Sequence, residues 1–113
     1  MRKLLNITKE TEILNKVESA ETFLTRLKGL LGRASLEQGS GIVIDPCNSV
    51  HCFFMRFPID VAFVDKDNKV LNVISNMKPW SISPIVLKSK YVIESNAGEL
   101  SGTLEKGDVL QII

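Results

Sequence analysis

Short apolar runs separated by polar segments recur along most of this 113-residue chain. Runs of this length, rich in β-branched and aromatic residues and bounded by Gly, Pro, Asn and Asp, are typical of β-strands. The polar segment D-K-D-N-K at residues 65–69 joins two of the runs and predicts a hairpin turn. The pattern predicts strands over residues 4–7, 13–17, 42–44, 50–56, 59–64, 70–74, 85–87, 91–94 and 109–113. Many short strands with turn signals between them indicate a mainly β fold, either a sandwich or a barrel.

One segment follows the period of a helix instead of that of a strand. Ser19 suits the N-cap of such a helix, and Gly32 weakens its end. The sequence therefore predicts one short α-helix at about residues 20–31, packed on the β-structure. Its apolar face consists of Phe23, Leu24, Leu27, Leu30 and Leu31, which recur at helical spacing.

Composition and charge place the chain among ordinary small globular proteins. Hydrophobic residues make up 44% of the sequence, and the length fits one compact domain, which we expect to span residues 1–113. The 14 basic residues against 13 acidic ones leave almost no net charge. Because nucleic-acid-binding proteins usually carry a basic excess or stripe, we expect no nucleic-acid partner.

The start of the chain and its cysteines bear on location. The apolar part of residues 1–10 is too short for the ~7–15 apolar residues of a signal peptide. No run approaches the ~18 apolar residues of a membrane span. We therefore expect a cytoplasmic protein with no membrane partner. The two cysteines are too few for a disulfide scaffold, and a reducing compartment would keep them as thiols.

The segment Val50–Asp65 holds most of the residues that could carry chemistry, including the single His and four of the five Phe. Arg56 lies among apolar neighbours in the sequence: it pairs with an acidic partner, lines a pocket for an anionic or polar ligand, or is exposed without a role. Trp80, in a Pro-flanked loop, covers the core or stacks on a ligand. The hypothesis we favour is a non-enzymatic module that binds a small molecule or a peptide, without a cofactor. Its pocket would be lined by His51, Arg56, Asp60, Trp80 and Glu94.

Two other classes of function stay open. A hydrolase or metal-dependent enzyme would use His51 with Asp60 or Cys47. Zinc sites need three or four ligands, and beyond Cys47, His51 and Cys52 the chain has no other Cys or His, so we expect no metal site. In a strand, moreover, His51 and Cys52 point to opposite faces. The third hypothesis is an accessory protein that docks on a larger partner through an exposed sheet edge.

Four motifs make the chain resemble a known family. They are T-R-L-K-G-L-L-G-R at residues 25–33, H-C-F-F-M-R-F-P-I-D-V-A-F-V-D at 51–65, Y-V-I-E-S-N-A-G at 91–98 and G-D-V-L-Q-I at 107–112. Together they resemble the small bacterial and archaeal proteins called domain of unknown function 192. Thr25 and Leu31 stand where that family usually has Glu and Met, and Cys52 where many members have Thr. The resemblance implies a small jelly-roll-like sandwich or barrel with a helix packed on it, and no established enzymatic activity.

Overall fold

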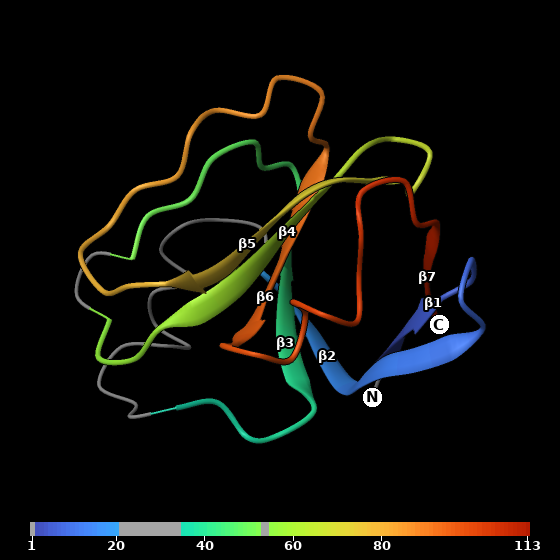
Figure 1. The fold of residues 1–113 in the computed structure, drawn as a ribbon, viewed down its shortest axis with the longest axis horizontal. Helices are drawn as coiled ribbons and strands as arrows, with labels where there is room; N and C mark the ends of the chain where they lie inside the picture. Colours follow the sequence, from blue (N-terminus) through green and yellow to red (C-terminus); the bar gives the residue numbers. More distant parts are fainter. Residues whose placement is uncertain (1, 21–34, 53–54) are drawn as a thin grey trace.

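The computed structural model describes residues 2–20, 35–52 and 55–113, and in these residues seven strands form a single sheet. Along the sheet the strands follow the order β5-β4-β6-β3-β2-β1-β7 (Figure 1). The strands, in chain order, are β1 (Arg2–Asn6), β2 (Thr11–Ala20), β3 (Ser40–Ile44), β4 (Ile59–Val64), β5 (Val70–Met77), β6 (Tyr91–Asn96) and β7 (Leu110–Ile112).

Every neighbouring pair of strands is antiparallel except β2 and β3. β1 with β2 and β4 with β5 follow each other in sequence and form hairpins, as their alternating patterns and polar turns predict. β2 and β3 run parallel, with Lys16 opposite Ser40 at one end of the pair and Ala20 opposite Ile44 at the other. This parallel pair joins the first hairpin to the antiparallel group β3-β6-β4-β5.

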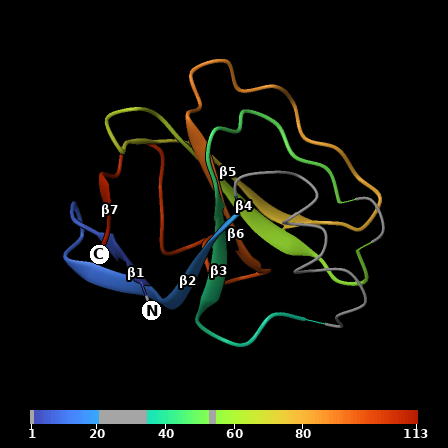
Figure 2. The same ribbon diagram turned by 180° about the vertical axis from the view of Figure 1, so that it is seen from behind.

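The sheet curls into a half-barrel whose two outer strands meet at one end. The backbone N–H of Val70 at the start of β5 donates to the carbonyl of Asp108 at 2.8 Å, and the N–H of Leu110 in β7 donates to the carbonyl of Asn68 at 2.8 Å. Figures 1 and 2 show the C-terminal segment beside the turn between β4 and β5. These bonds satisfy backbone groups that an open sheet edge would leave unpaired.

The inner face of the half-barrel holds one of two hydrophobic cores, which we call the inner core. All seven strands contribute to it, and its members are almost fully removed from solvent. Side chains alternate between the two faces of a strand, which is why every second residue of β4, Ala62 and then Val64, points into this core. The inner core consists of Leu4, Leu14, Val17, Val43, Ala62, Val64, Val70, Tyr91, Ile93, Leu100, Leu104 and Leu110.

The outer face of strands β3, β6, β4 and β5 carries the second core, which we call the outer core. Ile59, Val61 and Phe63 of β4 point into it, so β4 is buried on both faces. Both faces of β4 are therefore apolar, as its unbroken run of buried residues requires. The remaining members are Leu36, Ile42, Ile44, Val50, Cys52, Met55, Phe57, Met77 and Val92.

Two loop segments that cover the outer core, residues 47–52 and 78–86, are bonded to each other along their backbones. The N–H of Trp80 donates to the carbonyl of Cys52 at 2.7 Å, and the N–H of Cys52 donates to that of Ser81 at 2.8 Å. Two more such bonds, each 2.8 Å, join Ser83 to Val50 and Val86 to Asn48. The 78–86 loop is thus held in place over the core.

The prediction of a mainly β fold is confirmed, and the curled sheet is a half-barrel. The strand expected at residues 85–87 is absent, because the described 78–90 segment there forms a loop. Ser19, expected to cap a helix, lies in β2 opposite Val43. Of the helix expected at residues 20–31, Ala20 forms the end of β2. The remaining residues, 21–31, lie outside the described part of the chain.

Candidate functional site

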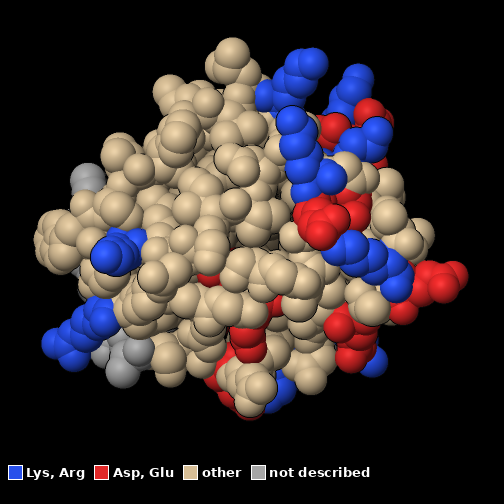
Figure 3. Space-filling model, in the orientation of Figure 1, with Lys and Arg blue, Asp and Glu red and all other residues tan. Residues whose placement is uncertain are grey.

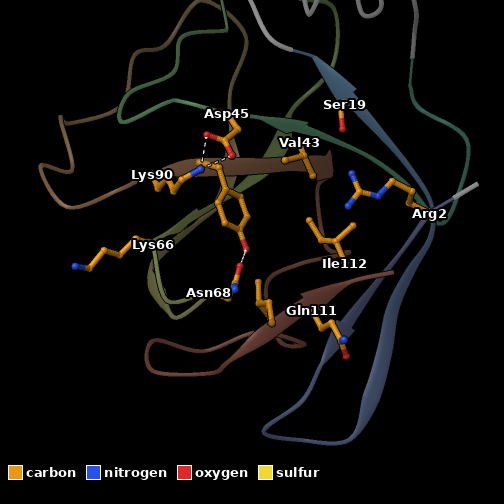
Figure 4. A pocket seen from close by; sticks show the side chains of 11 residues that line it. Arg2, Ser19, Val43, Asp45, Lys66, Asn68, Lys90, Gln111 and Ile112 are labelled. Carbon is orange, nitrogen blue, oxygen red and sulfur yellow. Dashed lines mark hydrogen bonds and ion pairs between the residues drawn. The ribbon is translucent and has the colours of Figure 1, made fainter.

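A polar pocket of about 580 Å³ opens at the end of the half-barrel where β7 meets the turn between β4 and β5 (Figure 4). Small-molecule sites usually have volumes of roughly 300–1,000 Å³, so a small ligand fits this space. Strands β1, β2, β3, β6 and β7 and the loops between them contribute to its walls. The lining residues are Arg2, Ser19, Val43, Asp45, Lys66, Asn68, Lys90, Tyr91, Leu110, Gln111 and Ile112.

The pocket combines an apolar floor with a charged rim. Val43 and Leu110 belong to the inner core, and Ile112 packs against it. Three of the lining side chains are basic (residues 2, 66 and 90) and one is acidic (residue 45), but Lys66 points away from the opening (Figure 4), which leaves an excess of one positive charge at the rim. A molecule with an apolar body and a negatively charged group matches both features.

The basic residues of the rim differ in their partners. Nζ of Lys90 lies 3.0 and 2.8 Å from the two carboxylate oxygens of Asp45. Because both side chains are about half exposed, this ion pair contributes little to stability and mainly orients Lys90. Arg2 has no ion-pair partner among the described residues, and Figure 4 shows it reaching from β1 toward the pocket, whereas Lys66 points away. Arg2 is therefore the guanidinium best placed to meet an anion.

Tyr91 places a buried hydroxyl in the pocket wall. Its O–H donates to Oδ1 of Asn68 at 2.9 Å. Burial, together with the negative charges of Asp45 and Asp65, raises the pKa of Tyr91 to about 12. The phenol therefore stays protonated at neutral pH, and its oxygen keeps a lone pair that can accept a hydrogen bond from a ligand.

Asp60, one of the residues predicted to line a site, is fully buried and accepts five hydrogen bonds. Burial alone would raise the pKa of its carboxyl, but backbone N–H groups of Ser101, Asn76 and Leu100 and the Ser101 hydroxyl outweigh burial and lower that pKa. The carboxylate is thus ionised at neutral pH, and its hydrogen bonds all lead to neighbouring backbone and to Ser101. This geometry suits a structural anchor.

Glu94 is also fully buried, but on the other face of the sheet from Asp60. In the pairing of β4 with β6, Val61 stands opposite Glu94 and Asp60 opposite Ser95. Since successive side chains point to opposite faces, Glu94 lies on the side of the outer core and Asp60 on the side of the inner core. The structure therefore does not bring these two predicted site residues together.

His51, Arg56 and Trp80 lie on the segments that cover the outer core. His51 is partly buried and forms a bridge with Ile82, next to the backbone bond between Trp80 and Cys52. Arg56 and Trp80 are exposed. Of the five predicted site residues, His51 and Trp80 therefore lie on two neighbouring segments whose backbones are hydrogen-bonded to each other.

The two candidate metal ligands, Cys47 and His51, lie on the 47–52 segment, which covers the outer core. Cys47 is half-buried, and its thiol donates to the carbonyl of Ser49 at 3.1 Å. Within the described part of the chain, no three Cys, His, Asp or Glu side chains come together as metal ligands.

The polar pocket was missed by the sequence reasoning, because its residues come from distant parts of the chain. Arg2, Asn68 and Gln111 each look like ordinary surface residues in their own segments. Only the curling of the sheet brings them to one opening. One signal was present: polar residues gather at the strand ends, in the 65–69 turn and before Tyr91.

The fold and the pocket together define the class of protein, a small β half-barrel with a polar pocket at one end, which we call the barrel mouth. The sequence profile of the DUF192 family, described as "Uncharacterized ACR, COG1430", matches residues 5–112, and the chain belongs to this family. UPF0127 protein PF1050 of Pyrococcus furiosus is 32% identical over 114 residues, which cover 96% of each chain. UPF0127 protein TK1120 of Thermococcus kodakarensis is 31% identical over 113 residues, covering 95% of this chain and 71% of that protein. The resemblance drawn from the motifs is confirmed.

Two solved structures share the fold. A protein of unknown function from Novosphingobium aromaticivorans superposes with a TM-score of 0.80 at 22% identity, covering 97% of this chain and 82% of that chain. A protein from Sinorhizobium meliloti, which its description proposes to be a transcription regulator, gives a TM-score of 0.76 at 24% identity, covering 97% and 90%. At these identities the likeness establishes the fold alone.

A helix able to cross a membrane is absent from the described residues, because none there is long and apolar enough.

Proposed function

We propose that the protein is a non-enzymatic module that binds a small organic anion in the polar pocket at the mouth of the half-barrel. The single observation that carries this proposal is the pairing of an apolar floor, formed by Val43, Leu110 and Ile112, with the positive charge of Arg2 at the rim. The proposal keeps the class of function expected from the sequence and moves the site to the barrel mouth. Of the residues expected to line the site, His51 and Trp80 lie on the loop segments over the outer core, which we call the outer cover.

Arg2 carries the recognition of the negative group. Its guanidinium can donate two parallel hydrogen bonds to a carboxylate or a phosphate, and it has no competing ion pair among the described residues. Lys90 is held at the rim by Asp45, which limits how strongly it attracts a second anion. The hydroxyl of Tyr91 supplies a neutral polar contact for the rest of the ligand.

Isothermal titration calorimetry with phenyl phosphate, phenol and inorganic phosphate as probes tests this proposal. Phenyl phosphate carries both an apolar body and an anionic group, while each of the other probes carries one of them. We expect phenyl phosphate to bind more tightly than phenol or inorganic phosphate. The substitution Arg2→Gln should weaken the binding of phenyl phosphate by roughly tenfold to a hundredfold, since a charge-assisted hydrogen bond is worth about 1.5–3 kcal/mol.

The matched control is Lys88→Gln, which removes one exposed positive charge outside the pocket. This variant should bind phenyl phosphate as the wild type does. Equal affinity of the Arg2→Gln and wild-type proteins for phenyl phosphate would contradict the proposed site, as would a preference for phenol.

The enzymatic alternative in which His51 acts with Asp60 gains no support from the geometry, and His51 acting with Cys47 stays a hypothesis. The carboxylate of Asp60 accepts its hydrogen bonds from residues 76, 98, 100 and 101, and none from His51. A general base must lie within hydrogen-bond reach of its partner in the reaction. The absence of a cofactor and a cytoplasmic location stay predictions.

A further inference from the structure

Four large apolar side chains stand out from the loop that follows β5, and we call them the apolar strip. Trp80 is 61% exposed, Ile82 67%, Ile85 66% and Leu87 87%. All four fall within eight consecutive residues. Single exposed hydrophobic residues are ordinary on soluble proteins, but a contiguous exposed group usually marks a surface that contacts something apolar.

The strip is presented by a firmly held loop. Backbone hydrogen bonds tie residues 80, 81, 83 and 86 to residues 48, 50 and 52, and the hydroxyl of Ser83 accepts a further bond from the N–H of Val50 at 2.9 Å. Beneath the strip, Ser83 is buried and Val86 packs against the outer core. The exposed side chains are therefore arranged in advance, and contact would order few additional groups.

Basic side chains outnumber acidic ones around the strip. Residues 46–59 and 76–90, which include the two paired segments, contain no Asp or Glu. They contain Arg56, Lys78 and Lys88, which are exposed and form no ion pair with any described residue, and Lys90, which pairs with Asp45. In Figure 3 the upper left of the view, where the 78–90 loop runs in Figure 1, shows no acidic side chain and is largely uncharged.

We propose that the apolar strip docks on an anionic lipid surface. Trp80, Ile82 and Leu87 would enter the boundary between headgroups and acyl chains, a region where Trp is favoured. Arg56, Lys78 and Lys88 would face the negative headgroups, where each basic side chain adds to the attraction. The strip projects from the loop, and a soft lipid interface accepts projecting side chains, whereas a protein partner would need a matching groove.

This inference goes beyond the proposed function, because none of the four strip residues lines the polar pocket. It also revises the expectation of no membrane partner, which rested on the lack of a membrane-spanning run. Interfacial docking needs no spanning segment, since apolar side chains enter only the outermost part of the bilayer.

Trp80 is the single Trp of the chain, so its fluorescence reports directly on the strip. The test adds vesicles of phosphatidylcholine mixed with an equal amount of phosphatidylglycerol to the full chain. The expected result is a blue shift of the emission and co-sedimentation of the protein with the vesicles. Vesicles of phosphatidylcholine alone, or added salt, should weaken both signals, because the basic side chains lose their counterpart or are screened.

Variants that keep Trp80 separate this contact from a general property of the protein. Ile85→Ser with Leu87→Ser should lower the fraction bound to mixed vesicles by roughly tenfold or more, because two apolar side chains are lost from the contact. The matched control is Ile7→Ser, which removes an exposed apolar side chain from the β1–β2 turn, far along the chain from the strip. Its vesicle binding should equal that of the wild type.

Three outcomes would overturn the proposal. One is the absence of a blue shift and of co-sedimentation with mixed vesicles. Another is equal vesicle binding by the strip variant and the wild type. The third is a dimer in sedimentation equilibrium without vesicles that the strip variant abolishes, which would make the strip a contact between copies of the chain.

Discussion

Asp60 and Ser101 lie 41 positions apart in the sequence, and two hydrogen bonds join them. The backbone N–H and the hydroxyl of Ser101 both donate to Oδ2 of Asp60, each at 2.8 Å. The N–H groups of Gly98 and Leu100 donate to the same oxygen at 2.8 and 3.1 Å, while Oδ1 accepts from the N–H of Asn76 at 2.9 Å. One carboxylate therefore ties the start of β4 to the end of β5 and to the turn after β6.

Replacing this carboxylate should destabilise the fold strongly. In Asp60→Asn, an NH₂ group would replace one of the two carboxylate oxygens. Because that NH₂ group is a donor, the N–H groups that face it would lose their acceptor in either orientation of the amide. We expect the free energy of unfolding to fall by about 2–4 kcal/mol, as for other buried charged groups that lose a partner. Urea denaturation followed by circular dichroism measures the change.

Asp65→Asn is the matched control for that substitution. Asp65 also accepts two backbone hydrogen bonds on one oxygen, from Asp67 and Lys69, but it lies in an exposed turn. An Asn oxygen can accept both, so the loss should stay below about 1 kcal/mol. Equal losses in the two variants would contradict a special anchoring role for Asp60.

Acid should destabilise the protein through Asp60 and Asp108. Both carboxyls have a pKa below 3.8 in the folded state, because hydrogen bonds outweigh the effect of burial. A lowered folded-state pKa means that the unfolded chain binds protons more readily, so stability is full above pH 3.8 and declines as pH falls toward the folded-state values. The free energy of unfolding, measured from pH 7 down to acid, should therefore drop below about pH 4. A profile that is flat there would contradict this account.

Tyr91 should lose its proton at a higher pH than an exposed tyrosine, because its pKa is raised. It is the single Tyr of the chain, so the ultraviolet absorbance of the phenolate reports it alone. The folded protein should show a midpoint at about 12, against 10.0 for the unfolded chain. The neutral phenol is the form that the fold favours, so this contribution to stability is present below pH 10.0 and is lost as pH rises toward 12. A folded-state midpoint near 10 would mean that the hydroxyl is not buried beside the carboxylates.

Gly41 in β3 leaves room for a neighbouring side chain. A Cβ at this position would lie 2.5 Å from Cδ1 of Leu14 and 3.1 Å from the carbonyl oxygen of Glu94. Gly41→Ala should lower the free energy of unfolding by about 1–3 kcal/mol, the usual range for overpacking. Because Leu14→Ala removes the crowded atom, the double variant should lose less than the sum of the single variants. Additive losses would exclude the predicted crowding.

Much of the strand content could be predicted from local patterns. The run at 59–64 and the turn at 65–69 were placed correctly, because a buried strand next to an Asp- and Asn-rich turn is decided within a few residues. The prediction of a strand at residues 85–87 was wrong. These side chains are largely exposed, and the backbone there bonds to the 47–52 segment instead of to a strand of the sheet.

The site was harder to predict than the fold. Asp60 attracted attention as a charge among apolar residues, and only the turn that donates to it explains its place there. Asp60 and Glu94 could not be assigned to opposite faces without the register of β4 on β6. The polar pocket is lined by Arg2, Tyr91 and Gln111, which come from distant parts of the chain, and no local pattern brings them together.

Backbone amide NMR of the full chain during a titration with phenyl phosphate tests the central claim most directly. The account predicts saturable shifts centred on Arg2, Asn68, Tyr91 and Gln111, and none centred on residues 78–88. Saturable shifts centred instead on His51 and Trp80 would place ligand binding on the outer cover. That result, or the absence of any saturable shift, would contradict the assignment of the binding site to the barrel mouth.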